Sequence, residues 1–295
     1  MIKNMFGRTW KKVRNMEEVK KYLIAIGGRE EKGTGSELVR IRLPYSVFTF
    51  YNNGTIYSTP SDDPKLFDVW KKIDEIINGR FKKPSQDFLI GLDETGKGEV
   101  IGPIILTGVI FHKDDFEMID YIIGTADTKK KHSLDYWNKL FNDLSKVKSV
   151  FYKFSEISPD EIDKNNINRL MDLKYRELIT SLLEKVEIER TRIVIDDYGL
   201  GESLKTFLHS LKAEVIISTN SEDFYLETKL ASVISKYIRE IKIQELREKY
   251  IIEGLNFGSG NLDDPTTKSW LEKWKKEKGE YPEIVRKSFL KNLKI

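Results

Sequence analysis

Two adjacent carboxylates, Asp93 and Glu94, follow directly on the apolar run 88–92. Acids at the end of a buried strand are costly to desolvate unless a cation compensates their charge, and a divalent metal ion is the usual compensation. An Asp-Glu pair in front of a glycine can also be an ordinary solvated turn. The residue types therefore indicate a metal site, with a simple turn as the alternative.

The residues after this pair favour a phosphate ligand. Gly96, Gly98 and Gly102 carry no Cβ atom, so the backbone there can closely approach another surface. Lys97 places a positive charge among these glycines. Backbone N–H groups and a cation in one turn are suited to a phosphate backbone.

The composition limits the kinds of metal site and nucleophile that the chain can form. The chain has no cysteine and three histidines, which excludes disulfides, thiolate metal sites and a cysteine nucleophile. A metal site must then be built from oxygen ligands, which favours Mg²⁺ or Mn²⁺ over Zn²⁺. No apolar run approaches the length of a membrane span, and the first residues lack the apolar core of a signal peptide. We expect a cytoplasmic protein that makes no use of a membrane.

The net charge of +3 is unevenly distributed. Residues 1–86 hold 17 Lys and Arg against 10 Asp and Glu, a balance of +7, whereas residues 87–295 hold 33 against 37, a balance of −4. A basic module attached to an acidic body is typical of an enzyme that binds a polyanion, although lysine-rich surfaces are often only solvated. We expect a basic N-terminal substrate-binding domain with a linker over 1–86 and a catalytic domain over 87–295.

The hydrophobic pattern predicts different folds for these two parts. The first part should be a small α+β domain, with a hairpin turn at 52–54 and a basic linker at 79–86. Its helices are expected over 17–26 and 64–78, and its strands over 38–43, 47–51 and 55–58. Aromatic residues in the hairpin alternate in direction, and we expect at least half of them to fill the core.

The second part should be a mixed α/β sheet with carboxylates at its strand ends. Strands are expected over 88–92, 101–111, 150–154, 192–195 and 214–217. Helices are expected over 133–144, 159–186, 202–211, 224–250 and 266–278.

Two further acid pairs could join the first. Asp196 and Asp197 end an apolar strand, and Glu222 and Asp223 precede a helix. Phosphodiester hydrolysis with two metal ions needs several carboxylates that converge from separate elements. Asp197 could instead begin a turn, and Glu222 and Asp223 could simply be the first-turn acids that a helix dipole favours.

The string Asp-Glu-Thr-Gly-Lys-Gly followed by Gly-Pro, within residues 93–103, resembles the signature of the type 2 ribonuclease H family, ribonucleases HII and HIII. The resemblance covers essentially residues 88–290. It implies a ribonuclease H-like mixed sheet flanked by helices. It also implies an endoribonuclease that cuts the RNA strand of RNA/DNA hybrids with two metal ions and leaves 5′-phosphate and 3′-hydroxyl ends.

The same resemblance implies a set of site residues. The catalytic and metal-binding residues would be Asp93, Glu94, Asp196 and Glu222, the last of which lies ten positions before Ser232 as in the family. Asp197 and Asp223 remain the competing ligands for the third and fourth positions. Lys97 and the backbone of Gly96 and Gly98 would lie over the ribose. Thr128 and Lys129 resemble a family segment ahead of a helix, whose N-terminus could hold a phosphate.

Features of both subfamilies occur together. The hairpin at 44–57 is similar to the TATA-binding-protein-like N-terminal extension of ribonuclease HIII, and glutamate at position 222 is also the ribonuclease HIII choice. The segments 257–267 and 281–288 are similar to archaeal ribonuclease HII. Either an RNA/DNA hybrid or another RNA-containing duplex can therefore be the partner. The alternatives are a hybrid-binding protein that does not cleave, and a metal-dependent DNA nuclease on the same fold.

Overall fold

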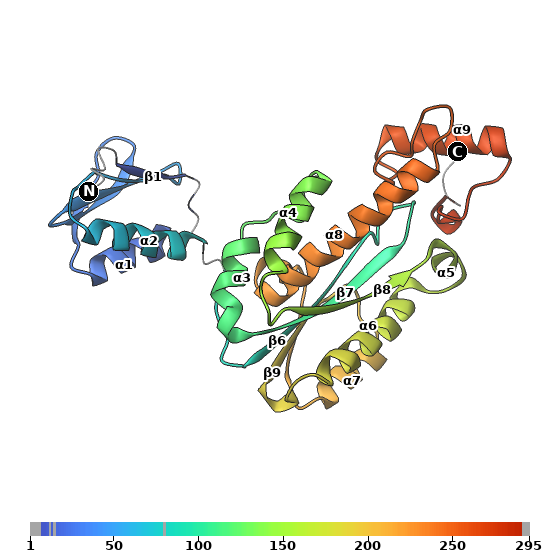
Figure 1. The fold of residues 1–295 in the computed structure, drawn as a ribbon, viewed down its shortest axis with the longest axis horizontal. Helices are drawn as coiled ribbons and strands as arrows, with labels where there is room; N and C mark the ends of the chain where they lie inside the picture. The colour runs from blue at the N-terminus through green and yellow to red at the C-terminus, as the bar shows by residue number, and fades with distance from the viewer. Residues whose placement is uncertain (1–6, 12, 14–15, 79–80, 291–295) are drawn as a thin grey trace. The chain divides into compact units, whose positions relative to one another are not determined.

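A computed structural model of the chain describes residues 7–11, 13, 16–78 and 81–290, which form two compact units. The first unit is Met1–Arg80 and the second is Phe81–Ile295 (Figure 1). Within the described ranges, no helix is both long enough and apolar enough to cross a membrane.

The N-terminal unit is one antiparallel sheet with two helices. Its five strands lie in the order β1-β5-β4-β3-β2. They are β1 (Arg8–Trp10), β2 (Arg29–Lys32), β3 (Glu37–Leu43), β4 (Ser46–Tyr51) and β5 (Ile56–Ser58), and the helices are α1 (Met16–Ala25) and α2 (Lys65–Asn78). The predicted helices and strands are confirmed. The predictions missed β1 and β2, and the sequence of β2, Arg-Glu-Glu-Lys, contains no apolar residue that could reveal it.

The core of this unit lies between the sheet and both helices. It includes Phe48 and Phe50 of β4, which are almost fully buried against apolar residues of α1 and α2. Thr49 lies between them in sequence and pairs with Arg40 of β3 and Tyr57 of β5. Because side chains alternate along a strand, Arg40, Thr49 and Tyr57 form a row on the face away from the helices.

The second unit is built on a mixed sheet in the order β10-β9-β6-β7-β8. The strands are β6 (Phe88–Thr95), β7 (Ile104–His112), β8 (Phe151–Ile157), β9 (Thr191–Asp196) and β10 (Glu214–Ser218). Strands β6, β9 and β10 run parallel to one another, whereas β7 pairs antiparallel with β6 on one side and with β8 on the other. The predicted mixed sheet is confirmed.

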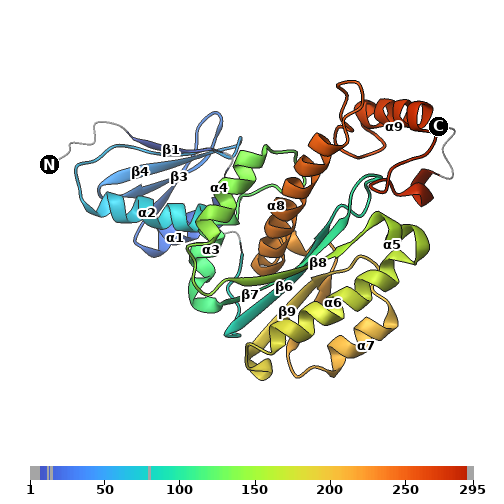
Figure 2. The same cartoon turned by 45° about the vertical axis from the view of Figure 1, so that its right-hand side comes forward.

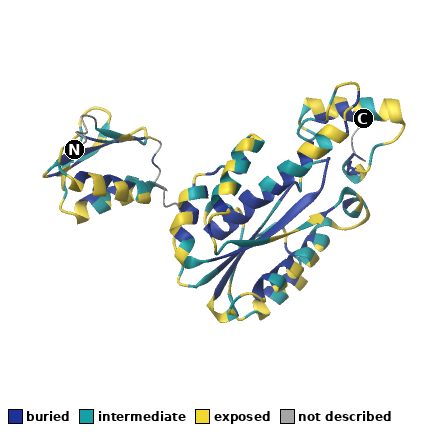
Figure 3. Cartoon of the chain, in the orientation of Figure 1, coloured by how far each residue is buried: buried dark blue, intermediate teal, exposed yellow. Residues whose placement is uncertain are grey.

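Helices cover both faces of this sheet (Figures 1 and 2). One face carries α3 (Phe116–Ile123), α4 (Leu134–Leu144) and α8 (Leu226–Lys249), and the other carries α5 (Pro159–Lys164), α6 (Ile167–Leu183) and α7 (Glu202–Ser210). A separate cluster joins α9 (Pro265–Lys278) to the end of α8 and to the C-terminal segment. The sheet and the inner side of α8 form the most deeply buried part of the unit (Figure 3).

Two predictions for this unit need correction, and one helix was missed. The single helix expected over 159–186 is two helices, because Asn165 is extended and the side chain of Asn166 caps α6 by accepting from the N–H of Arg169. Helix α3 was not predicted. Residues 81–86, expected to be linker, pack with the second unit, where Phe81 joins the core and Lys83 pairs with Glu117. Residues 79 and 80 of that linker lie outside the described residues.

Helix α8 lies unusually close to β6. A Cβ atom at Gly91 would lie 1.9 Å from the carbonyl oxygen of Glu227, so only glycine permits this contact. Beside it, Arg192 of β9 and Glu227 form a buried ion pair at 2.7 Å. These two contacts fix the start of α8 against the strands that carry the candidate acids.

Candidate active site

The carboxyl ends of three parallel strands bring the candidate acids to one end of the sheet. Leu92 of β6 pairs with Ile195 of β9, so Asp93 and Asp196 occupy corresponding positions on neighbouring strands. Asp196 also pairs with Ser218, the last residue of β10. The chain then enters a short 3-10 helix, η3 (Ser221–Asp223), which carries Glu222.

A backbone contact fixes this short helix to β9. The N–H of Ser221 donates to the Asp196 carboxylate at 2.7 Å, and the N–H of Asp197 donates to the carbonyl of Ser218 at 3.0 Å. Asn220, just before η3, has a φ of 51°, a left-handed conformation that asparagine tolerates better than most residues. Glu222 therefore reaches the site from a well-defined turn.

Asp93 is the electrostatic centre of the group. Burial raises its pKa well above the ordinary value, and the carboxylates of Glu94, Glu222 and Asp196 raise it further, in that order after burial. A hydrogen bond from Ser232 of α8 acts in the opposite direction. All four predicted acids thus lie close enough to interact through their charges.

Glu94 is held from the other side of the sheet. The hydroxyl of Tyr175, on α6, donates to its carboxylate at 3.0 Å. Burial raises the pKa of Glu94 to about 7, although the Tyr175 hydrogen bond and the charge of Lys97 both lower it. Tyr175 is itself fully buried and stacks on Tyr198 with ring centroids 5.4 Å apart. This packing fixes the phenol that orients Glu94.

Glu222 lies among hydroxyls and lysines. Its carboxylate accepts hydrogen bonds from Thr128 and from Ser232, the latter at 2.7 Å. The ammonium groups of Lys129 and Lys229 lie 3.5 and 3.9 Å from it. Protein donors therefore satisfy Glu222 in this conformation.

The two competing acids take part in local structure instead. The carboxylate of Asp197 accepts from the N–H groups of Gly199 and Leu200 at 3.0 and 3.3 Å, as in an Asx turn. Asp223 pairs with Lys129 at 2.7 Å. This geometry favours Asp196 and Glu222 as the inward-facing members of each pair.

The helix N-terminus expected directly after Thr128 and Lys129 lies further along the chain. Helix α4 begins only at Leu134, with Ser133 as its cap. The N–H groups of Lys129 and Lys130 donate to the Asp127 carboxylate at 3.1 and 3.2 Å, so a turn has already taken them. Thr128 and Lys129 instead point their side chains at Glu222 and Asp223.

The glycines after Glu94 differ from one another. Gly96 and Gly102 have φ values of +88° and +84°, which other residues rarely adopt. Gly98 has no such φ, and a Cβ atom there would meet nothing within 4 Å. Between them, Lys97 donates to the carbonyl of Tyr198 at 2.9 Å and lies 5.0 Å from the centroid of its ring. The backbone at Gly98 is thus open on one side.

The donor chemistry of this site fits a divalent cation, although its side chains do not yet form a ligand shell. Within the described part of the chain, no three His, Cys, Asp or Glu side chains are arranged to hold an ion. Each carboxylate discussed above is turned towards a protein donor. The set nevertheless offers only oxygen atoms, and its mutual repulsion is what a hard cation relieves. Small side-chain rotations would have to accompany metal binding.

Sequence reasoning missed several side chains around the acids. Tyr175, Tyr198 and Lys229 were not predicted to be part of the site, and Ser232 served only as a position from which to count. The sequence could have indicated the serine, because it lies ten residues after Glu222, and in the structure its hydroxyl donates to the Glu222 carboxylate. Tyr175 carried no such signal, since it lies 81 residues from Glu94.

Comparison with known proteins places the chain in a family. A family model described as "Ribonuclease HII" matches residues 90–292. The ribonuclease HII of Sulfurisphaera tokodaii is 33% identical over 201 residues, which cover 68% of this chain and 92% of that protein.

Two solved structures are similar to different extents of the chain. The ribonuclease H2 of Pyrococcus horikoshii OT3 has a TM-score of 0.56 at 30% identity and covers 68% of this chain and 93% of its own. Aquifex aeolicus RNase H3 has a TM-score of 0.53 and covers 96% of this chain and 100% of its own, so its likeness includes the N-terminal unit. At 19% identity, that second likeness is one of fold alone. The chain is a ribonuclease H enzyme and belongs to the ribonuclease HII family.

Proposed function

We propose that the chain is an endoribonuclease that hydrolyses the RNA strand of RNA/DNA hybrids with two divalent cations, Mg²⁺ or Mn²⁺. The observation that carries this proposal is the convergence of four carboxylates at one end of the sheet, where they raise the pKa of Asp93. Such a group of like charges is unfavourable in a protein unless cations join it.

Asp93, Glu94, Asp196 and Glu222 would hold the two ions. Asp93 is suited to contact both, because it interacts with each of the other three carboxylates. The bound ions would stabilise the negative charge that develops on the phosphate and would activate the attacking water. Tyr175, Ser232 and Thr128 would orient the carboxylates through the hydrogen bonds they already make.

The reaction is a phosphodiester hydrolysis. A water oxygen forms a bond to phosphorus while the bond from phosphorus to the 3′ oxygen breaks, and that oxygen leaves with a proton. The products are a 5′-phosphate and a 3′-hydroxyl. Burial raises the pKa of Glu94 to about 7 in the metal-free protein, close to neutral pH.

The glycine loop would recognise the sugar. A 2′-hydroxyl is what distinguishes RNA from DNA at a single nucleotide. Lys97 and the backbone of Gly96 and Gly98 would lie over this ribose, and the open side of Gly98 leaves room for it. Lys129, now paired with Asp223, would exchange that partner for a phosphate, whereas Thr128 would act on Glu222.

The N-terminal unit would bind the duplex outside the cleavage site, as in ribonuclease HIII. The charge balance of residues 1–86 supports this role, and so do the half-buried side chains of Arg40 and Tyr57 on the face away from the core. Arg40 is paired with Glu37 at 2.8 Å, so a phosphate would have to compete with a carboxylate there. The glutamate at position 222 and the presence of this N-terminal unit are both ribonuclease HIII features, and they favour a substrate preference like that of ribonuclease HIII.

The proposal is tested by cleavage assays on three duplexes, with Mg²⁺ and separately with Mn²⁺. We expect the wild-type enzyme to cut an RNA/DNA hybrid and to leave all-DNA intact, and a duplex with one ribonucleotide distinguishes the two subfamilies. Asp93→Asn should reduce hybrid cleavage by more than about 100-fold, because loss of a ligand should exceed the 10–100-fold typical of outer contacts. Binding of the hybrid should remain measurable.

The two rival functions give different results in the same assays. A hybrid-binding protein would bind the hybrid without cutting it, and a DNA nuclease would cut the all-DNA duplex. Full activity of Asp93→Asn would reject the assigned site.

A further inference from the structure

The loop between β6 and β7 is bound by the C-terminal segment of the chain. The N–H of Gly102 donates to the carbonyl of Ile284 at 2.8 Å, and the N–H of Arg286 donates to the carbonyl of Val100 at 2.9 Å. Ile101 and Val285 form a β-bridge between these contacts. The segment 284–286 therefore pairs with the second half of the glycine loop, far from it in sequence.

Arg286 makes the most specific of these contacts. Its side chain is fully buried, and its guanidinium donates to the carbonyl of Gly102 through Nε at 2.9 Å and Nη2 at 2.8 Å. Nη1 donates to the carbonyl of Lys97 at 3.1 Å. Burial lowers the pKa of Arg286 to about 9, so the group stays charged at neutral pH. One rigid cation thus holds both ends of the turn that contains Gly98.

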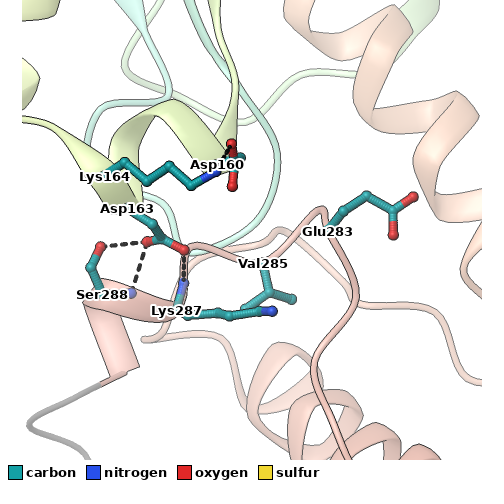
Figure 4. Close-up of a pocket in the computed structure, with 7 residues that line it drawn as sticks. All are labelled: Asp160, Asp163, Lys164, Glu283, Val285, Lys287 and Ser288. Atoms are coloured by element: carbon teal, nitrogen blue, oxygen red, sulfur yellow. Dashed lines mark hydrogen bonds and ion pairs between the residues drawn. The ribbon is translucent and has the colours of Figure 1, made fainter.

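Arg286 is itself held in place from the opposite direction. Directly after it begins the 3-10 helix η4 (Lys287–Leu290). The carboxylate of Asp163, in α5, accepts from the N–H groups of Lys287 and Ser288 at 2.9 and 2.8 Å and from the Ser288 hydroxyl at 2.6 Å (Figure 4). This anchor fixes the backbone on which Arg286 is carried.

A second buried arginine holds the middle of the loop. Arg239 of α8 pairs with Glu99 at 2.6 Å and donates to the carbonyl of Ile101 at 3.2 Å. The charge of Glu99 also favours the charged form of Arg286. The loop is therefore fixed by side chains from both the helical layer and the C-terminal segment.

A buried guanidinium is a poor means of stabilising a fold. Its desolvation is costly, and well-packed apolar residues often stabilise a protein equally well or better. An arginine that bonds to two backbone carbonyls of one turn does, however, fix the conformation of that turn. Preorganised backbone donors are what a binding site for a specific sugar requires.

We infer that Arg286 is a positioning residue, which sets the backbone of the loop 96–102 so that Gly98 and Lys97 face the substrate. The inference rests on the proposed function, because only a substrate at this loop makes its conformation matter for turnover. Arg286 touches none of the four carboxylates in the contacts described above, so it acts through the loop alone.

The test combines amide hydrogen exchange with steady-state cleavage of an RNA/DNA hybrid, using Arg286→Lys. Lysine keeps the charge but cannot span two carbonyls with a planar fork. We expect the amides of Val100, Ile101 and Gly102 to exchange about 10-fold faster or more, because charge-assisted hydrogen bonds are lost. We also expect kcat to fall about 10-fold, and Mn²⁺ to stabilise the variant and the wild type equally against heat.

Arg192→Lys is the matched control, since Arg192 is another buried arginine but pairs with Glu227 instead of the loop. Any general loss of stability should appear in both variants, and faster exchange confined to residues 100–102 should appear only in Arg286→Lys. Equal exchange and equal kcat in the two variants would overturn the inference.

Asp163→Asn serves if Arg286→Lys fails to fold, because it weakens the anchor of η4 and keeps the guanidinium of Arg286 in place. It should accelerate exchange of the same three amides by a smaller factor, and unchanged exchange would overturn the inference. A wild-type enzyme that cuts no hybrid would instead refute the proposed function, and the exchange data would still decide whether Arg286 fixes the loop.

Discussion

A buried acid and a group of half-buried acids lie against the same strands and are compensated in different ways. Glu227 of α8 is fully buried, and Arg192 of β9 pairs with it at 2.7 Å. Burial raises the pKa of Glu227 too, but the charge of Arg192 opposes that rise. At the carboxyl ends of the same strands, burial raises the pKa values of Asp93 and Glu94, and other carboxylates are their neighbours. The donors that reach this second group are hydroxyls, a backbone N–H and lysines.

The comparison separates a structural acid from acids that need an external charge. A paired acid completes the fold by itself, whereas clustered carboxylates lower the stability of the metal-free protein. The difference cannot be seen from the residue types, because both groups consist of acids beside apolar strands. The difference follows from the group that faces each carboxylate, which is an arginine for Glu227 and other carboxylates for Asp93.

The largest expected effect on stability comes from neutralising one acid in each group. Glu227→Gln leaves Arg192 buried without its charged partner and should lower the free energy of unfolding by about 3 kcal/mol. Asp93→Asn removes a repelled charge and should leave the metal-free protein equally stable or more stable. Urea unfolding of both variants in the presence of a chelator measures the difference. A destabilisation of similar size in both would remove the distinction between the groups.

A smaller effect should appear in the pH dependence of the metal-free protein. The pKa of Glu94 is raised from 4.5 to about 7 on folding, so the folded state holds this proton more tightly than the unfolded state. Its contribution to stability is then complete below about pH 4.5 and is lost as the pH rises through 7, by at most about 1.4 kcal/mol per pH unit.

The difference in unfolding free energy between wild type and Glu94→Gln isolates this contribution across the pH range. Tyr175→Phe is the companion variant, because the Tyr175 hydrogen bond lowers the pKa of Glu94. Without it, the loss of stability should extend to higher pH. If the difference in unfolding free energy between wild type and Glu94→Gln stays constant from pH 4.5 to 7, the raised pKa assigned to Glu94 is contradicted.

The smallest effect on stability is expected at Gly98. A Cβ atom there meets no protein atom within 4 Å, so Gly98→Ala should change the unfolding free energy by no more than about 0.5 kcal/mol. Cleavage of the hybrid should nevertheless fall about 10-fold or more, because the added methyl group occupies the open side of the loop. Gly96→Ala is the contrast: it should destabilise the fold, since its Cβ atom would lie 2.3 Å from Nε of Arg239. Unchanged cleavage by Gly98→Ala would place the ribose elsewhere.

Much of the fold could be predicted because local patterns decided it. The apolar run before Asp93 is a central strand, and the hairpin at 52–54 joins two paired strands. The error over 159–186 is instructive. Two side chains, Ser158 and Asn166, start separate helices by capping, and the polar run 163–166 separates the apolar residues of one helix from those of the next.

The rest of the site depends on contacts between distant parts of the chain. Tyr175 reaches Glu94 across 81 residues, and Arg286 reaches Gly102 across 184. Neither residue type indicates its partner, since tyrosine in a helix and arginine near a chain end are ordinary on their own. Only the packing of α6 and of the C-terminal segment against the sheet creates these contacts.

The most direct measurement for the four-carboxylate site is metal-dependent thermal stabilisation, with Mg²⁺ and Mn²⁺ titrated into wild type, Asp93→Asn and Asp197→Asn. The control residue, Asp197, bonds to its own turn and carries a similar charge. A ligand that binds only the folded state must raise its stability. We predict that wild type and Asp197→Asn are stabilised at the same metal concentrations and that Asp93→Asn is not. Equal stabilisation of Asp93→Asn would contradict a metal site centred on that residue.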